Sequence, residues 1–408
     1  MSQVEAHAVE MPPASHATIA HDSFRFVLIA TIAFLTLVDL FATQAILPSL
    51  ARKYDVSPAT MGVAVNASTF GMAVAGLLIA FFGRELDRRN GIWISLAVLA
   101  IPTTWLAFVD SIGAFAALRV AQGLCMASAF TLTMAYLAEH FTAGRATAAL
   151  SAYVTGNVAS NVFGRMLSAT VADQLGIATN FLVFAGLNLC GAALVYVTLM
   201  RAAKMMKTGN GHGVHLRDMA ALFANRQLSA AFVVGFLILF VFIGTYTYVN
   251  FRLTAPEIGL APMALGFVYL VFLPSLVTTP LAGAVANRLG TPLGVAATLS
   301  IAIVGMLLSL PANLPLVLLG LTLVAVGTFL AQAMATGFVG RTAASDQRAA
   351  ASGIYLSSYY AGGLAGSFVL GQVYDRAGWT ACVWVLAAVL ALGVLASRLL
   401  VTKVHAAG

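Results

Sequence analysis

Long apolar stretches separated by short polar breaks run through almost the whole chain. A helix needs about 20 apolar residues to cross a bilayer, and most of the breaks carry glycine, proline or charge, which mark the ends of such helices. The pattern predicts twelve spanning helices, at residues 26–48, 59–81, 92–109, 113–137, 147–172, 177–200, 228–250, 261–282, 292–310, 313–338, 349–373 and 379–400. We therefore expect an all-α membrane protein.

The longest polar break, at residues 201–227, divides these helices into two sets of six. The expected organisation is a disordered N-terminal tail (1–22), a six-helix bundle (23–200), a cytoplasmic linker (201–227), a second six-helix bundle (228–400) and a C-terminal tail (401–408). Residue types recur between the sets at offsets of 200 to 202, and the matches are Gly83 with Gly283, Arg88 with Arg288, Tyr153 with Tyr355, Gly164 with Gly366, Asp173 with Asp375, and Gly176 with Gly378. This recurrence favours two pseudo-repeated bundles, an arrangement that places a substrate site between them at the midplane of the membrane.

Composition agrees with a lipid-embedded chain. Of the 408 residues, 61% are hydrophobic and 9% are charged, whereas a soluble domain has about 25% charged residues. With both termini in the cytoplasm, fifteen Lys and Arg residues fall in cytoplasmic segments and four in outer loops. Basic residues are favoured on the cytoplasmic side, so we expect a multi-pass membrane protein with both termini cytoplasmic.

The net charge, the cysteines and the histidines do not indicate nucleic-acid binding, a disulfide or a metal site. The net charge of +7 comes from short loops between apolar runs, so it does not indicate a nucleic-acid partner. The three cysteines lie inside apolar runs and the histidines are scattered, so neither a disulfide nor a metal site is expected. The spans contain no H-E-x-x-H or G-x-S-x-G element, which argues against an intramembrane enzyme.

Three short motifs lie on or beside the predicted spans. The segment 83–91 is similar to the pattern G-x-L-A-D-R-x-G-R, from which it departs at Glu85 and at its last two residues, and it has a decayed copy at 283–290. The segment 118–123 contains R-x-x-Q-G inside a span, and the segment 39–48 joins an intramembrane acid to a following A-I-L-P. On these motifs, and over nearly its whole length, the chain resembles the major facilitator superfamily, in particular bacterial drug:proton antiporters and arabinose-efflux-type permeases.

The resemblance implies a secondary carrier of the bacterial inner membrane that works by alternating access, as a monomer and without a cofactor. It implies proton-coupled efflux of a small molecule. Proton-coupled uptake of a sugar or an organic acid on the same fold is the alternative. The chain lacks the G-P-x-x-G-G ending of the usual antiporter motif, which weakens the case for a multidrug exporter in particular.

Asp39 and Arg119 are the candidates for proton coupling. At 1.5 Å per residue, Asp39 lies about 20 Å from the inner face and Arg119 about 9 Å from the outer face, so in a core of about 30 Å their depths nearly coincide. An unpaired charge is costly at such depth, and we therefore expect an ion pair. The hypothesis is that Asp39 carries the proton and that Arg119 competes with it. A purely structural pair is the alternative.

Polar residues inside other spans are candidates for substrate binding. Asn157, Asn161 and Arg165 recur every four residues and predict one polar stripe, on which Arg165 either engages an anionic group or extends to the outer headgroups. The remaining candidates are Gln44, Tyr246, Tyr248, Gln332, Tyr355, Ser358 and Tyr359. Their hydroxyl, amide and ring groups suit a mid-sized, partly apolar solute. Tyrosines that are bonded to backbone inside the core are the alternative.

Two further features carry expectations about motion. Small residues four apart, at Gly156, Ser160 and Gly164 and again at Ser358, Gly362 and Gly366, are expected to form packing surfaces where the two halves rock. The motif loops are expected to latch the inner gate through Gly83, Asp87, Arg88, Gly283 and Arg288. Simple anchoring of the basic residues on the cytoplasmic side is the alternative.

Overall fold

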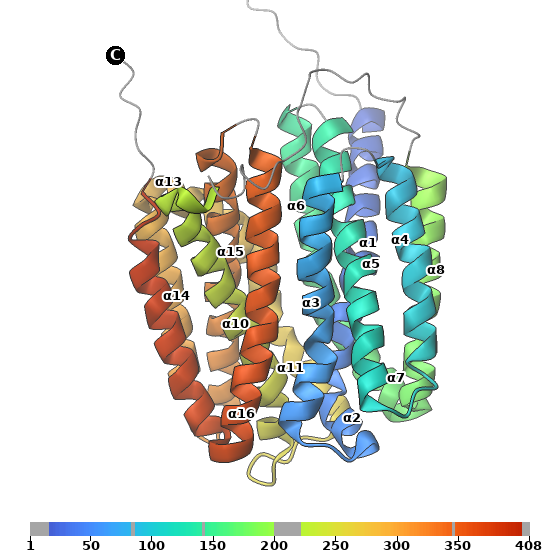
Figure 1. Ribbon diagram of the computed structural model, residues 1–408, viewed down its shortest axis with the longest axis vertical. Helices are drawn as coiled ribbons and strands as arrows, with labels where there is room; N and C mark the ends of the chain where they lie inside the picture. Colours follow the sequence, from blue (N-terminus) through green and yellow to red (C-terminus); the bar gives the residue numbers. More distant parts are fainter. Residues whose placement is uncertain (1–15, 83–85, 141–142, 200–221, 345–346, 402–408) are drawn as a thin grey trace, which may run out of the picture.

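The computed structural model describes residues 16–82, 86–140, 143–199, 222–344 and 347–401, and within these ranges the regular secondary structure is helical. The helices stand side by side in two adjacent groups, the first coloured blue to green and the second yellow to red (Figure 1). The first group contains α1 (His16–Ala45), α2 (Leu47–Tyr54), α3 (Pro58–Phe82), α4 (Arg88–Trp105), α5 (Ile112–His140), α6 (Ala143–Ala159), a π-helical turn (Ser160–Gly164), α7 (Arg165–Leu175) and α8 (Ile177–Thr198). The second group contains α10 (Arg226–Thr254), α11 (Pro262–Val268), a 3₁₀ turn (Tyr269–Phe272), α12 (Leu273–Thr278), a second 3₁₀ turn (Thr279–Leu281), α13 (Ala282–Leu289), α14 (Thr291–Leu308), α15 (Leu314–Thr342) and α16 (Arg348–Ser397).

Nine helical stretches within the described ranges are long and apolar enough to cross a bilayer. Each of the twelve predicted spans contains helical residues. Three of these spans do not add a stretch of their own to the nine. The helix α4 has only 18 residues and begins with two arginines. The span at 147–172 is divided between α6, the π-helical turn and α7, and the last two spans are joined in α16.

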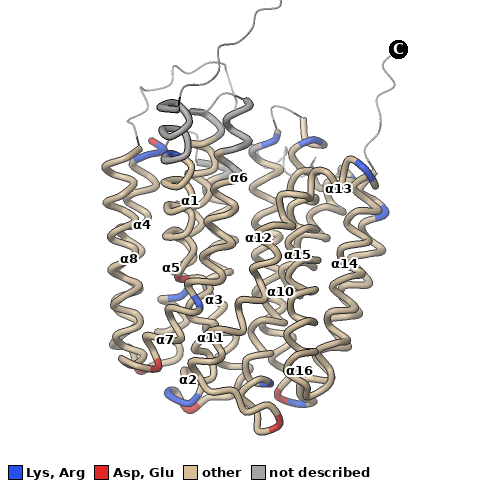
Figure 2. Tube along the Cα trace, turned by 180° about the vertical axis from the view of Figure 1, so that it is seen from behind, with Lys and Arg blue, Asp and Glu red and all other residues tan. Residues whose placement is uncertain are grey.

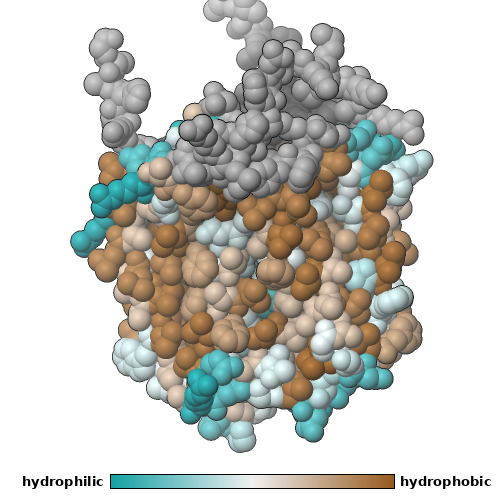
Figure 3. Space-filling view, in the orientation of Figure 1, coloured by the Kyte–Doolittle hydropathy of each residue, from teal (hydrophilic) through white to brown (hydrophobic). Residues whose placement is uncertain are grey.

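The outer surface of the bundle is apolar around its middle. Figure 3 shows a broad hydrophobic band on one face, with hydrophilic residues towards the two ends of the helices. Large side chains exposed on the bundle include Ile101, Trp105, Val197, Val277, Leu293 and Phe368. An apolar surface of this extent is unstable in water and matches the hydrocarbon core of a bilayer.

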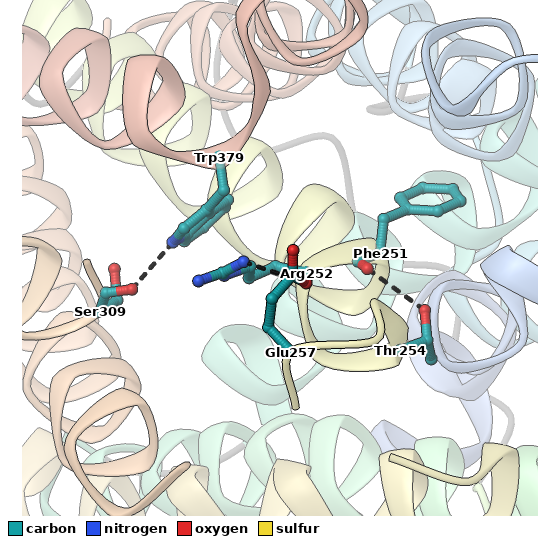
Figure 4. A network of polar contacts seen from close by, with 6 residues as sticks. All are labelled: Phe251, Arg252, Thr254, Glu257, Ser309 and Trp379. Carbon is teal, nitrogen blue, oxygen red and sulfur yellow. Dashed lines mark hydrogen bonds and ion pairs between the residues drawn. The ribbon is translucent and has the colours of Figure 1, made fainter. Parts of the chain in front are cut away.

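The helix α16 changes direction at Gly378. Its 50 residues would reach about 75 Å as one straight helix, far more than a membrane core of about 30 Å. Gly378 has φ 69° and ψ −169°, a backbone conformation that is essentially restricted to glycine. The chain reverses there, at the lower end of Figure 1, and the indole of Trp379 donates to the Ser309 carbonyl at 3.0 Å (Figure 4).

Small residues pack helices together within each group. A Cβ on Gly156 would lie 2.0 Å from the Ala30 oxygen of α1, and a Cβ on Gly362 would lie 2.0 Å from the Phe236 oxygen of α10. The expectation that these residues line the surface between the halves is therefore wrong. Backbone oxygens of the same group occupy that space, and the close approach holds each group together.

Contact between the two groups is made largely by α3 and α16. A Cβ on Gly76 would lie 2.9 Å from the Ser357 hydroxyl, and this hydroxyl donates to the Ala73 carbonyl at 2.9 Å. Towards the other end, the Ala59 amide donates to the Asp375 carboxylate at 3.2 Å. The two groups thus touch along most of the length of α3.

The described boundaries differ from the expected ones at the N-terminus. The helix α1 begins at His16, so residues 16–22 of the expected tail are helical, since this segment contains no glycine or proline to end the helix. Residues 1–15, 402–408 and most of the expected linker, at 200–221, lie outside the described residues.

Candidate functional site

Arg119, on α5, is completely buried and fully hydrogen-bonded. Its Nε donates to the Val65 carbonyl at 2.8 Å, its Nη1 to Gln122 Oε1 at 2.6 Å, and its Nη2 to Ser68 Oγ at 3.1 Å. It also donates to the backbone carbonyls of Asp39 at 3.2 Å and Leu40 at 3.5 Å. Oxygens from α1, α3 and its own helix therefore hold this guanidinium in place.

The expected ion pair between Asp39 and Arg119 is not formed. Arg119 bonds the backbone oxygen of Asp39 and not its carboxylate, and among the described residues the ion pair is that of Arg252 with Glu257, at 3.4 Å (Figure 4). The Asp39 side chain is 3% exposed, and its Oδ2 has no hydrogen-bond partner in the described part of the chain. The depth argument placed both groups inside the bundle, but neutral oxygens satisfy Arg119 and leave the carboxylate unpaired.

A chain of neutral side chains links the two groups. Gln122 Nε2 donates to Thr103 Oγ1 at 2.7 Å, and Asn188 Nδ2 donates to the same oxygen at 3.1 Å. The Asn188 side chain lies beside the Asp39 carboxyl group. We call this set, Asp39, Asn188, Thr103, Gln122 and Arg119, the Asp39 relay. It joins α1, α8, α4 and α5.

Two relay members were not singled out in the sequence. Asn188 and Thr103 are each completely buried and lie within apolar spans. Buried amides and hydroxyls need partners, and a polar residue in the middle of an apolar span was the signal available. The partners themselves cannot be found without knowing which helices are neighbours.

Arg165, the first residue of α7, is also completely buried, so it does not extend to the outer headgroups. Its Nη2 donates to Gln44 Oε1, on α1. Its guanidinium carbon lies 4.2 Å from the ring centre of Tyr269, 4.9 Å from Phe272, 5.0 Å from Phe41 and 5.7 Å from Tyr246. We call these four rings the Arg165 cage. Phe41 belongs to the first group of helices, and the other three rings belong to the second.

Amide groups close the interface beside the cage. Gln44 Nε2 donates to Asn66 Oδ1 at 2.8 Å, and Asn66 Nδ2 donates across the interface to Thr247 Oγ1 at 3.0 Å and Ser367 Oγ at 3.1 Å. Asn250 Nδ2 donates to the Gln44 carbonyl at 2.9 Å. The two groups must break these bonds in order to separate at this level.

The predicted polar stripe contains several polar atoms without partners. Among the described residues, Asn157 Oδ1, both side-chain polar atoms of Asn161, and Arg165 Nε and Nη1 are buried and have no hydrogen bond. In a regular helix Asn157 and Arg165 would be about 80° apart around the axis, and the π-helical turn between them removes most of this angle. The turn thus brings the stripe onto one face. Such turns frequently mark functional sites.

Three of the remaining substrate-binding candidates are tyrosines that belong to two separate groups of aromatic rings. Tyr246 belongs to the cage, and its hydroxyl donates to the Leu321 carbonyl at 2.6 Å. Tyr355 and Tyr359 stack on one another at 6.2 Å, and the Tyr355 hydroxyl has no hydrogen bond among the described residues.

Two other candidates are bonded to backbone, as the alternative interpretation expected. Tyr248 donates to the Ser367 carbonyl at 2.6 Å, and Ser358 donates to the Phe232 carbonyl at 3.0 Å. Gln332 is half-buried on α15. The hydroxyls of Tyr248 and Ser358 are therefore not free for a ligand in this state.

The motif loops contribute mainly to helix ends. Asp87 accepts from the Asn90 amide at 2.9 Å and caps α4, which begins at Arg88. Gly283 and Arg288 lie in α13, and Gly83 lies outside the described residues. The expected latch stays a prediction.

One pocket of about 190 Å³ lies between the two groups of helices, and its lining includes neither Arg165 nor a ring of the Arg165 cage. It is lined by Ala45, Ile46, Pro48, Ser49, Arg52, Ala169, Ala172, Asp173, Thr254, Pro262 and Leu265. Ala45 directly follows Gln44 on α1, and Ala169 lies one turn beyond Arg165 on α7. The pocket therefore borders the level of the membrane at which Arg165 lies.

Comparison with known proteins gives consistent results. The family model of the Major Facilitator Superfamily matches residues 29–273 and 248–407. An uncharacterized MFS-type transporter of Bacillus subtilis, YybF, is 26% identical over 81% of this chain and 81% of its own length. The inner membrane transport protein YnfM of Escherichia coli is 23% identical over 91% and 89%, and a bicyclomycin resistance protein homolog of Haemophilus influenzae is 24% identical over 55% and 59%.

Solved structures show the same fold. A bacterial homolog of the human lysosomal transporter Spinster, in an inward-facing and unoccupied conformation, matches with a TM-score of 0.73 at 12% identity over 95% of this chain and 98% of its own. The nucleoside transporter NupG matches with a TM-score of 0.71 at 15% identity, over 93% and 100%.

Proposed function

Since this chain belongs to the Major Facilitator Superfamily, and is thus a multi-pass membrane carrier and not an enzyme, we propose that it exports a small molecule in exchange for protons. It does so as a monomer with twelve spanning helices in two six-helix bundles, through a site between them that opens to each side of the membrane in turn.

Asp39 carries the proposal of proton coupling. Its carboxyl group is buried, it has no ion-pair partner among the described residues, and one of its oxygens has no hydrogen bond there. Charge in such a place is costly, so the neutral acid is favoured while the site is closed. Water entering from one side removes this cost. Asp39 thus takes a proton from one compartment and releases it to the other.

The Asp39 relay supplies a route from protonation to movement. A charged Asp39 draws the Asn188 amide towards itself and away from Thr103, which changes the bonding of Gln122 and Arg119 in turn. Arg119 holds α5 against α1 and α3. Protonation can therefore alter the packing of the first bundle, which is the two-state element that coupling requires.

Two further observations support the arrangement. Gly164 packs on Val38, and Gly366 packs on Phe240. Each residue of the second contact has a number 202 higher than its counterpart in the first. This is the offset found in the sequence, as expected of a duplicated bundle. Charged residues gather at the two ends of the helices (Figure 2). One end has few acids, and it is proposed to be cytoplasmic. This end bears Arg88, Arg288, Arg341, Arg348 and Arg398.

Export is proposed in preference to uptake because one relative is named a bicyclomycin resistance protein homolog. The sign of a pH gradient decides between them. In proteoliposomes an antiporter accumulates its substrate in the acidic compartment, and a symporter accumulates it in the alkaline one, whichever way the protein is inserted.

The experiment uses labelled sugars, organic acids, nucleosides and cationic drugs, with protein-free liposomes as the control for passive distribution. We expect at least one compound to accumulate in an acidic lumen. Accumulation only in an alkaline lumen would establish uptake symport. Transport that is equal with an acidic lumen and with an alkaline lumen would refute proton coupling.

A further inference from the structure

Two arginines of the first group that are completely buried, Arg119 and Arg165, differ in how they are satisfied. Arg119 donates to five acceptors, whereas Arg165 has one, Gln44 Oε1. Arg165 Nε and Nη1 have no partner among the described residues. Arg119 shows that this bundle can satisfy a buried guanidinium with its own oxygens, and at Arg165 its described residues leave Nε and Nη1 without acceptors.

The surroundings of Arg165 provide no negative charge. Four aromatic rings lie within 4.2 to 5.7 Å of its guanidinium carbon, and no carboxylate of the described residues forms an ion pair with it. Ring faces attract a cation but accept no strong hydrogen bond. A buried charge without a paired anion is strongly unfavourable. The missing partner is thus an acceptor, and one with a negative charge also offsets the cost of the buried cation.

Neighbouring groups are suited to the rest of such a ligand. Asn161, on the same face, has an unpaired amide nitrogen and an unpaired amide oxygen. The pocket between the two groups of helices, which Ala169 lines one turn beyond Arg165, has a volume of about 190 Å³, and a cavity of about 150 Å³ is enough to hold benzene. A pocket of this volume is therefore large enough for a molecule with a single ring.

We infer that the Arg165 cage binds the anionic group of the substrate, and that the substrate is a small monocarboxylate with a planar apolar body. The carboxylate forms a bidentate pair along one edge of the guanidinium, made by Nε or Nη1 together with the second N–H of Nη2, in the geometry that arginine favours. The planar body lies against the rings of the cage, and Asn161 bonds a polar substituent.

The charge and shape of the ligand follow from the same contacts. Within the described part of the chain, Arg165 has N–H groups without acceptors, and Arg119, the other completely buried arginine of the first group, is saturated, so one negative charge is balanced and a second is not. The cage joins Phe41 of the first group to three rings of the second. A ligand held there touches both groups, which is the position that alternating access requires.

This inference rests on the proposed function, because it names the substrate class of the same carrier, but its test needs no proton gradient. The purified full chain in lipid nanodiscs is titrated at constant pH with benzoate, phenylacetate and cinnamate, with their neutral amides, and with phenyl phosphate as a dianion. Binding is measured by calorimetry and by the shift of the apparent melting temperature.

We expect at least one acid to bind at least about tenfold more tightly than its amide and than phenyl phosphate, since one charge-assisted bidentate pair is worth about that factor or more. Equal binding of acid and amide, preference for the dianion, or failure of all three acids to bind overturns the inference. This comparison uses the wild-type protein and does not depend on the folding of any variant.

Variants locate the site. Arg165→Gln is expected to lose the preference for acid over amide, and Arg165→Lys to retain a reduced preference, because lysine keeps the charge without the bidentate geometry. Arg376→Gln removes the same charge at an exposed position and is expected to bind as the wild type does. An unchanged preference in a folded Arg165→Gln protein would show that the anion binds elsewhere. Acid binding without proton-coupled transport leaves this inference intact and removes the proposed function.

Discussion

Replacement of Asp39 by asparagine is expected to reduce gradient-driven accumulation of substrate to the level of protein-free liposomes, a loss of at least about tenfold. Asparagine has nearly the same shape and can still bond Asn188, but it can neither take up nor release a proton. Exchange of labelled for unlabelled substrate, in the absence of a gradient, requires no net proton movement. We expect this exchange to continue in the variant.

The matched control is Asp110→Asn, which removes a carboxylate from an exposed position at the end of the bundle. Accumulation by this variant is expected to equal that of the wild type. If Asp39→Asn accumulates substrate at the wild-type rate, Asp39 is not the proton carrier. If it loses exchange as well as accumulation, the residue is required for the carrier to change state at all.

Replacement of Gly123 by valine is expected to abolish assembly of the first bundle. A Cβ at this position of α5 would lie 1.9 Å from the Ser68 oxygen and 3.0 Å from the Met72 amide nitrogen, both on α3. These are backbone atoms, so the two helices must move apart. The cost is about 3 kcal/mol or more, at the upper end of the range for overpacking. The displacement also removes Arg119 from its acceptors on α3, Val65 and Ser68.

The measurement is the yield of monodisperse protein in size-exclusion chromatography, together with the apparent melting temperature of any folded material. Gly186→Val is the control, because Gly186 is an exposed helical residue on α8 with no atom within 4 Å of a built Cβ. It introduces the same β-branched side chain into a helix without the collision. Similar yields from the two variants would show that α3 and α5 do not depend on this close approach.

The proposed exchange of substrate for protons and the proposed negative charge of the substrate fit together energetically. Export of a monoanion in exchange for an entering proton moves two charges in the same electrical direction. A cell interior that is negative by 100 mV contributes about 2.3 kcal/mol for each charge, so both the membrane potential and the pH gradient drive export. Uptake of the same anion with one proton moves no net charge and gains nothing from the potential.

The sequence was sufficient to predict the helices and the burial of two key charges. Apolar stretches are long and separated by charge, so their positions are clear, and depth along a span follows from 1.5 Å per residue. Depth does not specify the direction of a side chain around the helix axis, nor which acceptors compete for it. The ion pair of Asp39 with Arg119 was therefore wrongly predicted, although both residues are buried.

The Arg165 cage was only partly predictable. Arg165 itself was recognised as an intramembrane charge, and Gln44 and Tyr246 were recognised as polar groups. Phe41 and Phe272 carry no such signal, because an aromatic residue in an apolar span contacts lipid, core or ligand with equal plausibility. The π-helical turn at Ser160–Gly164, which aligns the stripe, also has no recognisable sequence signature.

The most direct test of proton coupling through Asp39 is a measurement of protons driven by substrate. Proteoliposomes with a pH-sensitive dye in the lumen and no initial pH gradient receive an outward gradient of a transported compound. We predict that the lumen acidifies in wild-type vesicles and does not change in Asp39→Asn vesicles. A lumen that acidifies equally in both, or in neither while substrate still leaves, would contradict the account.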